Sequence, residues 1–172
     1  MDYTPILLIA AMPFVVALQV YFLVRKMSEP ENMLKPVGPR GLGSTGEDAI
    51  ARQQAWLDAN GLQRLTSFEF GIIRAVVFQQ RGTQRFFTFH VHQQKVSHEA
   101  ESRFDEVTHL ETSNSGNSGM FPARPGVYKQ SFPGLTPEQL WQRHLEGEAY
   151  LMQKFSLGWR PLNLPYEQVV IS

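Results

Sequence analysis

The chain has 172 residues, no cysteine, and 16 basic against 16 acidic side chains. The lack of cysteine excludes thiol catalysis and zinc-ribbon sites. Balanced charge gives no electrostatic reason to expect a nucleic-acid partner, so we predict none. Without its apolar N-terminal segment the chain has the length of one globular domain.

That apolar segment, residues 5–24, is uncharged and ends at Arg25 and Lys26. As a helix rising about 1.5 Å per residue it would reach roughly 30 Å, the thickness of a bilayer's hydrocarbon core. The sequence therefore predicts a transmembrane anchor over residues 1–26. A cleaved signal peptide is the alternative, but it would have a basic start, a shorter apolar run and a small-residue cleavage site.

Basic residues flank the apolar segment on its C-terminal side, at Arg25, Lys26, Lys35 and Arg40. By the positive-inside rule the N-terminus faces outward and the following domain faces the cytoplasm. We therefore predict a single-pass protein of the cell inner (plasma) membrane, with the lipid bilayer as one of its partners.

Small and amide side chains within the anchor are candidates for contact with another membrane helix, because such residues allow close packing in lipid. They are Ala10, Ala11, Ala17 and Gln19. A helix that faces lipid, with alanine as filler, is the alternative.

Proline, glycine and scattered charge without periodicity predict a tether over residues 27–44. An α+β domain is predicted over residues 45–158, followed by an extended tail over residues 159–172. The domain begins with a helix that Thr45 caps and that Asn60-Gly61 ends.

Alternating apolar residues predict one strand over residues 68–78. Residues 80–83 indicate a hairpin turn, and the return strand covers residues 84–93. A third strand is expected over about residues 104–112. The polar residues 93–103 are expected to form a turn or an irregular edge.

Residues 112–119 have a polar, glycine-containing composition that predicts a mobile loop. Thr136-Pro137-Glu138-Gln139 combines a capping box with proline at the first helical position, so a helix should run from there to about Leu157. This order of elements predicts an α+β fold with an antiparallel sheet of three to five strands packed against two helices. A last strand is possible over residues 167–171.

Glu148 lies near the centre of the apolar face of the second predicted helix, and His144 stands one turn before it. A carboxylate in that position needs a partner. Arg74 is a further candidate, because it lies within the predicted strand over residues 68–78. We predict a structural polar cluster of Glu148, His144 and Arg74. Half of a metal or acid/base site is the alternative.

His90 and His92 project from one face of a predicted strand, a geometry compatible with zinc, copper or iron. His109 and Glu111 alternate in the same way on the next predicted strand, so four groups could gather if the strands pair in register. Two histidines do not complete a site, and no recognised ligand spacing is present. We therefore predict no metal and no cofactor.

Neither a glycine-rich phosphate loop nor a Gly-x-Ser-x-Gly elbow occurs, so the sequence gives no positive sign of an enzyme. We expect a non-catalytic, structural accessory subunit of a larger membrane complex, such as a respiratory or photosynthetic one. Its other subunits would be its partners, docking on apolar segments such as residues 120–122 and 169–171. The alternatives are a membrane-tethered sensor or ligand-binding module, and a small metal-dependent enzyme using His90 and His92.

Overall fold

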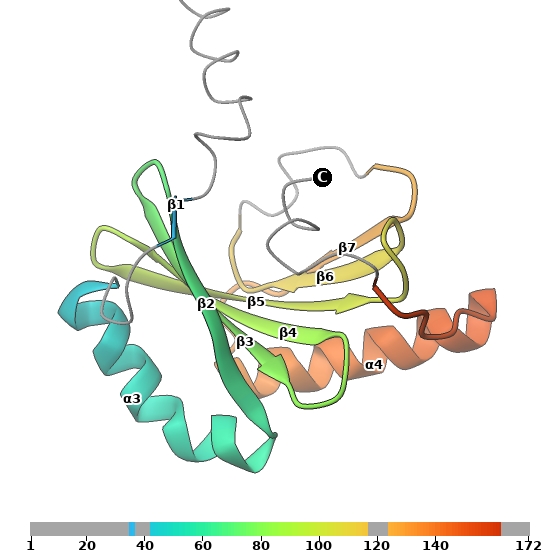
Figure 1. The fold of residues 1–172 in the computed structure, drawn as a ribbon, viewed down its shortest axis with the longest axis horizontal. Coiled ribbons are helices and arrows are strands. Elements are labelled where there is room, and N and C mark those ends of the chain that lie inside the picture. The colour runs from blue at the N-terminus through green and yellow to red at the C-terminus, as the bar shows by residue number, and fades with distance from the viewer. Residues whose placement is uncertain (1–34, 37–41, 117–123, 163–172) are drawn as a thin grey trace, which may run out of the picture.

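The structure is a computed structural model that describes residues 35–36, 42–116 and 124–162. In this part of the chain one mixed seven-stranded sheet forms a layer, and two helices cover one of its faces (Figure 1). The predicted α+β class is confirmed.

The strands follow one another across the sheet in chain order. They are β1 (Lys35–Pro36), β2 (Leu62–Phe70), β3 (Ile73–Gln80), β4 (Arg85–His92), β5 (Lys95–Arg103), β6 (His109–Ser113) and β7 (Val127–Ser131). Neighbouring strands are antiparallel except β6 and β7, which are parallel. The predicted antiparallel sheet of three to five strands is therefore wrong in both strand number and direction.

A two-residue turn divides what the sequence presented as one strand over residues 68–78. Phe70 pairs with Ile73, and Gly71 between them has a φ of 58°. That backbone conformation is open to glycine at little cost and suits a tight hairpin. Because the residues on both sides of the turn are apolar, the hydrophobic pattern continues through it and the sequence does not show that a turn is present.

Strand β5 covers residues expected to form a turn or an irregular edge. Its sequence is polar because alternate side chains point to the face opposite the helices. The strand expected over residues 104–112 is reduced to β6, and the preceding turn is closed by Asp105. Its Oδ1 accepts hydrogen bonds from the backbone N–H groups of Val107 and Thr108, at 2.9 and 2.6 Å.

Helix α3 (Gly43–Ala59) begins before the predicted Thr45 cap and has no side-chain cap at Leu42. Helix α4 (Pro137–Phe155) has the predicted capping box. The N–H of Thr136 donates to Oε1 of Gln139 at 3.1 Å, and the N–H of Gln139 donates to Oγ1 of Thr136 at 3.4 Å. Its end falls slightly before the predicted Leu157, with Ser156 in the left-handed conformation.

The core lies between the helical layer and the sheet, and aromatic rings form its centre. Trp56 of α3 contacts Phe87 of β4 edge-on at 5.1 Å between ring centroids, and Trp141 of α4 contacts the same ring at 6.0 Å. Phe87 and Phe89 are fully buried. The alternation of apolar residues over 84–93 thus places on one face of β4 the aromatic rings against which both helices pack.

Neither α3 nor α4 has the length and hydropathy of a transmembrane helix, and none is found elsewhere in residues 35–36, 42–116 and 124–162. The predicted anchor over residues 1–26, with Ala10, Ala11, Ala17 and Gln19, lies outside the described residues. So do the apolar segments 120–122 and 169–171 and the strand expected over residues 167–171.

Candidate functional site

The inner face of α4 carries two polar side chains among apolar ones. His144 is 0% exposed and Glu148 is 3% exposed. They stand one helical turn apart, and α4 packs there against β5 and β6. Buried groups of this kind require partners, because an unpaired polar atom in the interior loses its hydration without compensation.

Glu148 is bound by two side chains of the sheet. Arg85, at the start of β4, makes a bidentate pair with it: Nε to Oε2 is 2.8 Å and Nη2 to Oε1 is 2.5 Å. The hydroxyl of Ser102, on β5, donates to Oε2 at 2.5 Å. The hydrogen bond with Glu148 raises the pKa of Arg85, so the guanidinium stays charged.

His144 is held between two hydroxyl groups. Its Nε2 lies 2.7 Å from Oγ of Ser102, and its Nδ1 lies 2.8 Å from Oγ1 of Thr112 on β6. Gln130 of β7 donates from Nε2 to the same Oγ1 at 2.7 Å. Three adjacent strands, β4 to β6, therefore each contribute one side chain to the two polar residues of α4. Strand β7 joins the network through Gln130, which also donates to the backbone oxygen of Arg143 on α4 at 3.3 Å.

For a neutral imidazole ring, which the lowered pKa of His144 indicates, counting donors and acceptors gives the direction of every hydrogen bond in this network. The ionised carboxylate of Glu148 can accept but not donate, so Ser102 gives it its one proton. The Ser102 oxygen then accepts from Nε2 of His144, which leaves Nδ1 as the acceptor for Thr112. Thr112 in turn accepts from Gln130. We infer that His144 is the neutral Nε2–H tautomer.

The surroundings of His144 agree with a neutral ring. Burial lowers its pKa to about 3, and the nearby positive charge of Arg85 lowers it further in the same direction. The indole of Trp141 stacks on the imidazole with 5.8 Å between ring centroids and 21° between planes. The imidazole therefore has an apolar neighbour on its ring and a neutral hydroxyl group at each nitrogen. This environment favours the uncharged form.

Serine, histidine and glutamate are also the residue types of a hydrolytic triad, but their arrangement here is different. In a triad the imidazole accepts the serine proton, and a carboxylate holds the opposite ring nitrogen. Here Nε2 donates to Ser102, the serine proton goes directly to Glu148, and Thr112 occupies Nδ1. Ser102 is also 0% exposed. The arrangement joins α4 to the sheet and offers no activated nucleophile.

The structure brings two of the three residues of the predicted polar cluster together and places the third elsewhere. Arg74 lies at the start of β3, is exposed, and has its Nε 3.7 Å from Oε2 of Glu69. The position beside Glu148 that was expected for Arg74 is occupied by Arg85. The sequence could have indicated Arg85: it stands two residues before Phe87, so the alternation of the return strand places both side chains on the same face.

The histidines considered as metal ligands are not gathered into one site. Strand β5 separates His90 and His92 on β4 from His109 and Glu111 on β6. Nε2 of His109 lies 3.0 Å from Oε1 of Glu111, while His92 is exposed. Among the residues that the structure describes, no three histidine or acidic side chains are placed to share a metal ion.

A second charged cluster lies on the face of the sheet opposite the helices. It comprises Glu99, Glu101, Arg103, Glu111 and Lys129. Nε of Arg103 is 2.5 Å from Oε1 of Glu101, and Nζ of Lys129 is 2.9 Å from Oε2 of Glu111. Burial would raise the pKa of Glu111, but hydrogen bonds from His109 and Lys129 outweigh it and lower the pKa to about 2.

Glu99 differs from its neighbours because burial raises its pKa to about 8, and the charges of Glu111 and Glu101 add to the effect. The folded protein therefore keeps a proton on Glu99 that the unfolded chain releases between pH 4.5 and 8. It follows that the Glu99 contribution to the free energy of unfolding is present at pH 4.5 and is lost as the pH rises to 8.

We expect Glu99→Gln to weaken this loss of stability, because an amide has no proton to release. Denaturant midpoints of the full-length protein, measured at several pH values between 6.5 and 8, above the range in which the buried histidines act, provide the test. The exposed Glu146→Gln variant is the control and should keep the pH dependence of the parent. If both variants fall in stability as steeply as the parent, Glu99 is not the group responsible.

Comparison of the chain with protein-family models, curated proteins and solved structures finds no match. The class of protein is therefore defined by fold and site alone. The described part is an α+β domain whose C-terminal helix is tied to four strands by a buried polar network.

Proposed function

We propose that this protein is a single-pass, membrane-anchored accessory subunit of a larger membrane complex, such as a respiratory or photosynthetic one, with a structural rather than catalytic role. The membrane part of the proposal rests on residues 5–24. Following the positive-inside rule, the N-terminus lies outside and the α+β domain lies on the cytoplasmic side of the inner (plasma) membrane.

The observation that carries the structural role is the closed network around Glu148. The side chains best suited to chemistry are Ser102, His144 and Glu148, and each spends its hydrogen bonds on the others or on the sheet. A network whose members are all satisfied makes the helix and sheet rigid. A rigid domain without an activated group suits a subunit that presents surfaces to neighbours.

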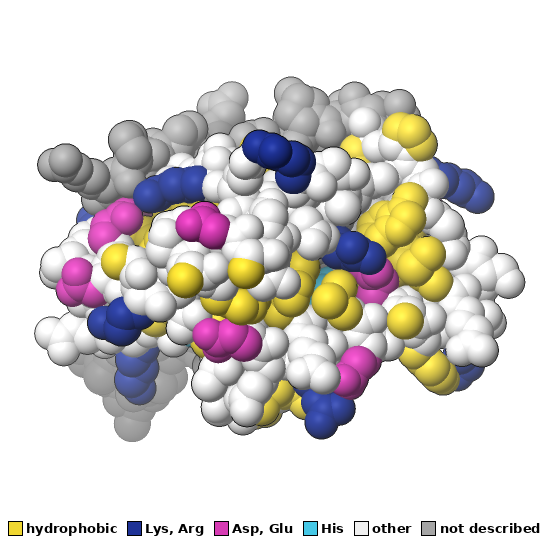
Figure 2. Space-filling view, turned by 90° about the horizontal axis from the view of Figure 1, so that it is seen from below, with side chains coloured by type: hydrophobic (Ala, Val, Ile, Leu, Met, Phe, Trp, Pro, Cys, Tyr) yellow, Lys and Arg dark blue, Asp and Glu magenta, His cyan; other side chains and the backbone are white. Residues whose placement is uncertain are grey.

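Apolar side chains on the helical side offer such surfaces. Figure 2 shows hydrophobic side chains gathered between charged ones on this face. On α4, Tyr150 is 55% exposed and Phe155 is 46% exposed. Aromatic residues are enriched where proteins meet, because they bury a large area with few rotatable bonds.

The experiment that tests this proposal is purification of the tagged full-length protein from membranes in mild detergent, followed by size-exclusion chromatography. We expect co-elution with other membrane proteins at fixed stoichiometry. A Tyr150→Ser, Phe155→Ser double variant should reduce co-elution, whereas Gln153→Ser, at an exposed polar position on the same helix, should not. Elution as a lone monomer would remove the support for a subunit role.

Because the chain has no cysteine, its orientation can be measured with single-cysteine variants. A membrane-impermeant maleimide applied to intact cells should label Asp2→Cys but not Gln153→Cys, and it should label both after the cells are broken. Labelling of Gln153→Cys in intact cells would contradict the cytoplasmic placement of the domain.

A membrane-tethered sensor or ligand-binding module is the second candidate. One observation favours it: Nε2 of His90 is buried, makes no hydrogen bond within the described part of the chain, and lies 4.0 Å from Oε2 of Glu99. A ligand that meets both groups would supply the missing bond. Stoichiometric zinc in the purified protein, lost in His90→Ala, would favour this candidate over the structural subunit.

A further inference from the structure

Two hairpin turns lie together at one end of the sheet. The turn Gly71-Ile72 joins β2 to β3, and the turn Gln93-Gln94 joins β4 to β5. Because Ile73 pairs with His92, both turns are at the same end (Figure 1). Ile72 is 75% exposed, the highest value among the large hydrophobic side chains described.

The pairing of β1 shows that the chain enters the sheet at this end. Lys35 pairs with Glu69 and Pro36 pairs with Phe68, in antiparallel orientation. Glu69 stands two residues before Gly71, so the first strand begins beside the turn that carries Ile72. The part of the chain that precedes Lys35 includes the predicted anchor.

The length of the tether limits how far this end can lie from the anchor. Residues 27–34 reach at most about 30 Å when fully extended. The opposite end of the sheet lies further away, because a strand of the length of β5 adds roughly 30 Å. Val107, in the turn between β5 and β6, marks that far end and is 69% exposed.

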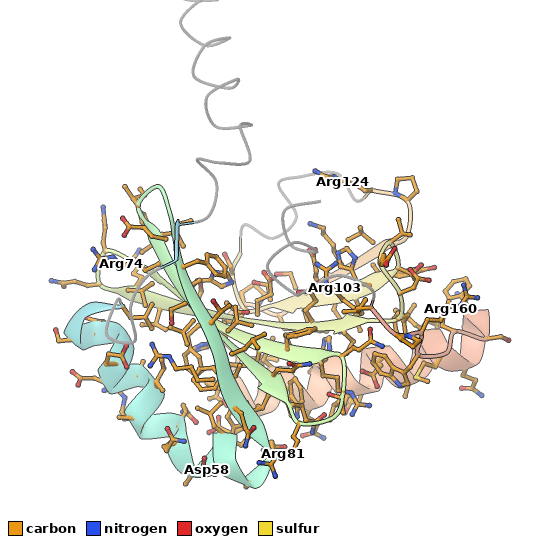
Figure 3. The ribbon with its side chains drawn as sticks, in the orientation of Figure 1. Asp58, Arg74, Arg81, Arg103, Arg124 and Arg160 are labelled. Carbon is orange, nitrogen blue, oxygen red and sulfur yellow. The ribbon has the colours of Figure 1, made fainter. Side chains whose placement is uncertain are left out.

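Positive charge accompanies Ile72 at the near end. Arg74 and Lys95 are both exposed there. Figure 3 shows Arg74 at this end and Arg81 and Arg160 away from it.

Acidic groups lie close to this end as well. Glu69 is engaged by Arg74, and Glu47 of α3 is engaged by Arg64. Asp48 is exposed on the first turns of α3. The Arg74–Glu69 contact is long, at 3.7 Å between Nε and Oε2, and both side chains are more than a third exposed, so a lipid phosphate can compete with Glu69 for the guanidinium. Lys95 adds a positive charge at the turn between β4 and β5, and Asp48 opposes it.

We propose that this end of the sheet rests on the bilayer surface, with Ile72 in the interfacial region and Arg74 and Lys95 beside anionic lipid headgroups. The cytoplasmic leaflet carries negative charge, which attracts basic residues near a membrane anchor. An exposed aliphatic side chain among them gains by leaving water for the headgroup and acyl boundary. This inference rests on the proposed membrane anchor.

The test uses full-length protein with a single introduced cysteine, reconstituted in vesicles of phosphatidylcholine and phosphatidylglycerol. Ile72→Cys and Val107→Cys are labelled with an environment-sensitive fluorophore, and spin-labelled lipids serve as quenchers. The two positions have similar exposure and lie at opposite ends of the sheet. We expect blue-shifted, strongly quenched emission from Ile72→Cys and unquenched emission from Val107→Cys.

Charge variants test the second half of the proposal. Adding Arg74→Glu and Lys95→Glu to the Ile72→Cys protein should reduce quenching in the mixed vesicles, as should vesicles of phosphatidylcholine alone. The neutral exposed pair Gln93→Ser and Gln94→Ser should leave quenching unchanged. Equal quenching of the labels at positions 72 and 107, or none at either, overturns the proposal.

A separate measurement distinguishes this failure from failure of the anchor. After an alkaline carbonate wash the vesicles are floated through a density gradient. Protein that floats but shows no quenching at position 72 retains its anchor and lacks the contact. That outcome would indicate that the exposed Ile72 contacts another protein and not the bilayer. Protein that does not float contradicts the anchor itself.

Discussion

Glu148→Gln is expected to lower the free energy of unfolding by about 3 kcal/mol, since removing one partner of a buried ion pair leaves the other charge unmatched. The amide nitrogen of the new side chain would meet Arg85 or Ser102, which are both donors. Chemical denaturation of the full-length protein in detergent, followed by tryptophan fluorescence, measures the change.

Glu146→Gln is the matched control for this substitution. Glu146 stands two residues away on the same helix, and its side chain is half exposed. It pairs with Arg143 at 2.9 Å across one helical turn. Pairs of this kind contribute about 0.3–0.5 kcal/mol. If the two variants unfold at the same denaturant concentration, the network around Glu148 does not stabilise the fold.

Three buried histidines should make the free energy of unfolding fall as the pH decreases from 6.5 to 4, and the single group Glu99 opposes part of this fall. Burial lowers the pKa of His144 to about 3 in the folded state, against 6.5 ordinarily. Burial also lowers the pKa of His90 and His98 to about 4. The unfolded chain therefore binds protons that the folded chain does not, and stability falls as the pH decreases. Each such group contributes up to about 1.4 kcal/mol per pH unit.

His144→Gln should make this decline less steep, because it removes one of the three groups. The quantity to compare is the slope of unfolding free energy against pH, so that a lower absolute stability of the variant does not obscure the result. Gln153→Ala changes no titrating group and should keep the parent slope. An unchanged slope in His144→Gln would show that the imidazole is already charged in the folded protein.

Local chemistry made parts of this structure predictable from the sequence. The capping box at Thr136 depends on residues four positions apart or closer, and α4 begins there. Helical periodicity placed Glu148 on the apolar face of α4, where it is buried. Alternation likewise defined β4, whose bounds lie within one residue of the expected strand over residues 84–93.

Features that depend on contacts between distant strands were not predictable in this way. Strand β5 is polar because one of its faces carries the charged cluster of Glu99, Glu101 and Arg103, so it lacked the expected alternation. Thr112 stood at the boundary between the expected strand over residues 104–112 and the expected loop over residues 112–119. The structure places it in β6, where its hydroxyl binds His144. Hydropathy periodicity cannot say which strands become neighbours.

That Arg85, and not Arg74, pairs with Glu148 also depends on contacts between distant strands. Both arginines belong to strands that pack beneath the helices, and both could have met a carboxylate there. Strand register and the position of α4 decide between them: Arg85 pairs with Ser102, which places both side chains beside Glu148. Register of this kind is set by the assembled sheet.

The joining of α4 to β4, β5, β6 and β7 has a consequence for how the protein reaches its native state. Arg85 and Glu148 are separated by 63 positions, so their contact carries a large loop-closure entropy and should form late in folding. A slip of one residue in β5 would turn the Ser102 hydroxyl away from its acceptor. Helix α4 can therefore dock fully only when the strands are in the native register. If they are misaligned, the carboxylate of Glu148 loses its partners on the sheet.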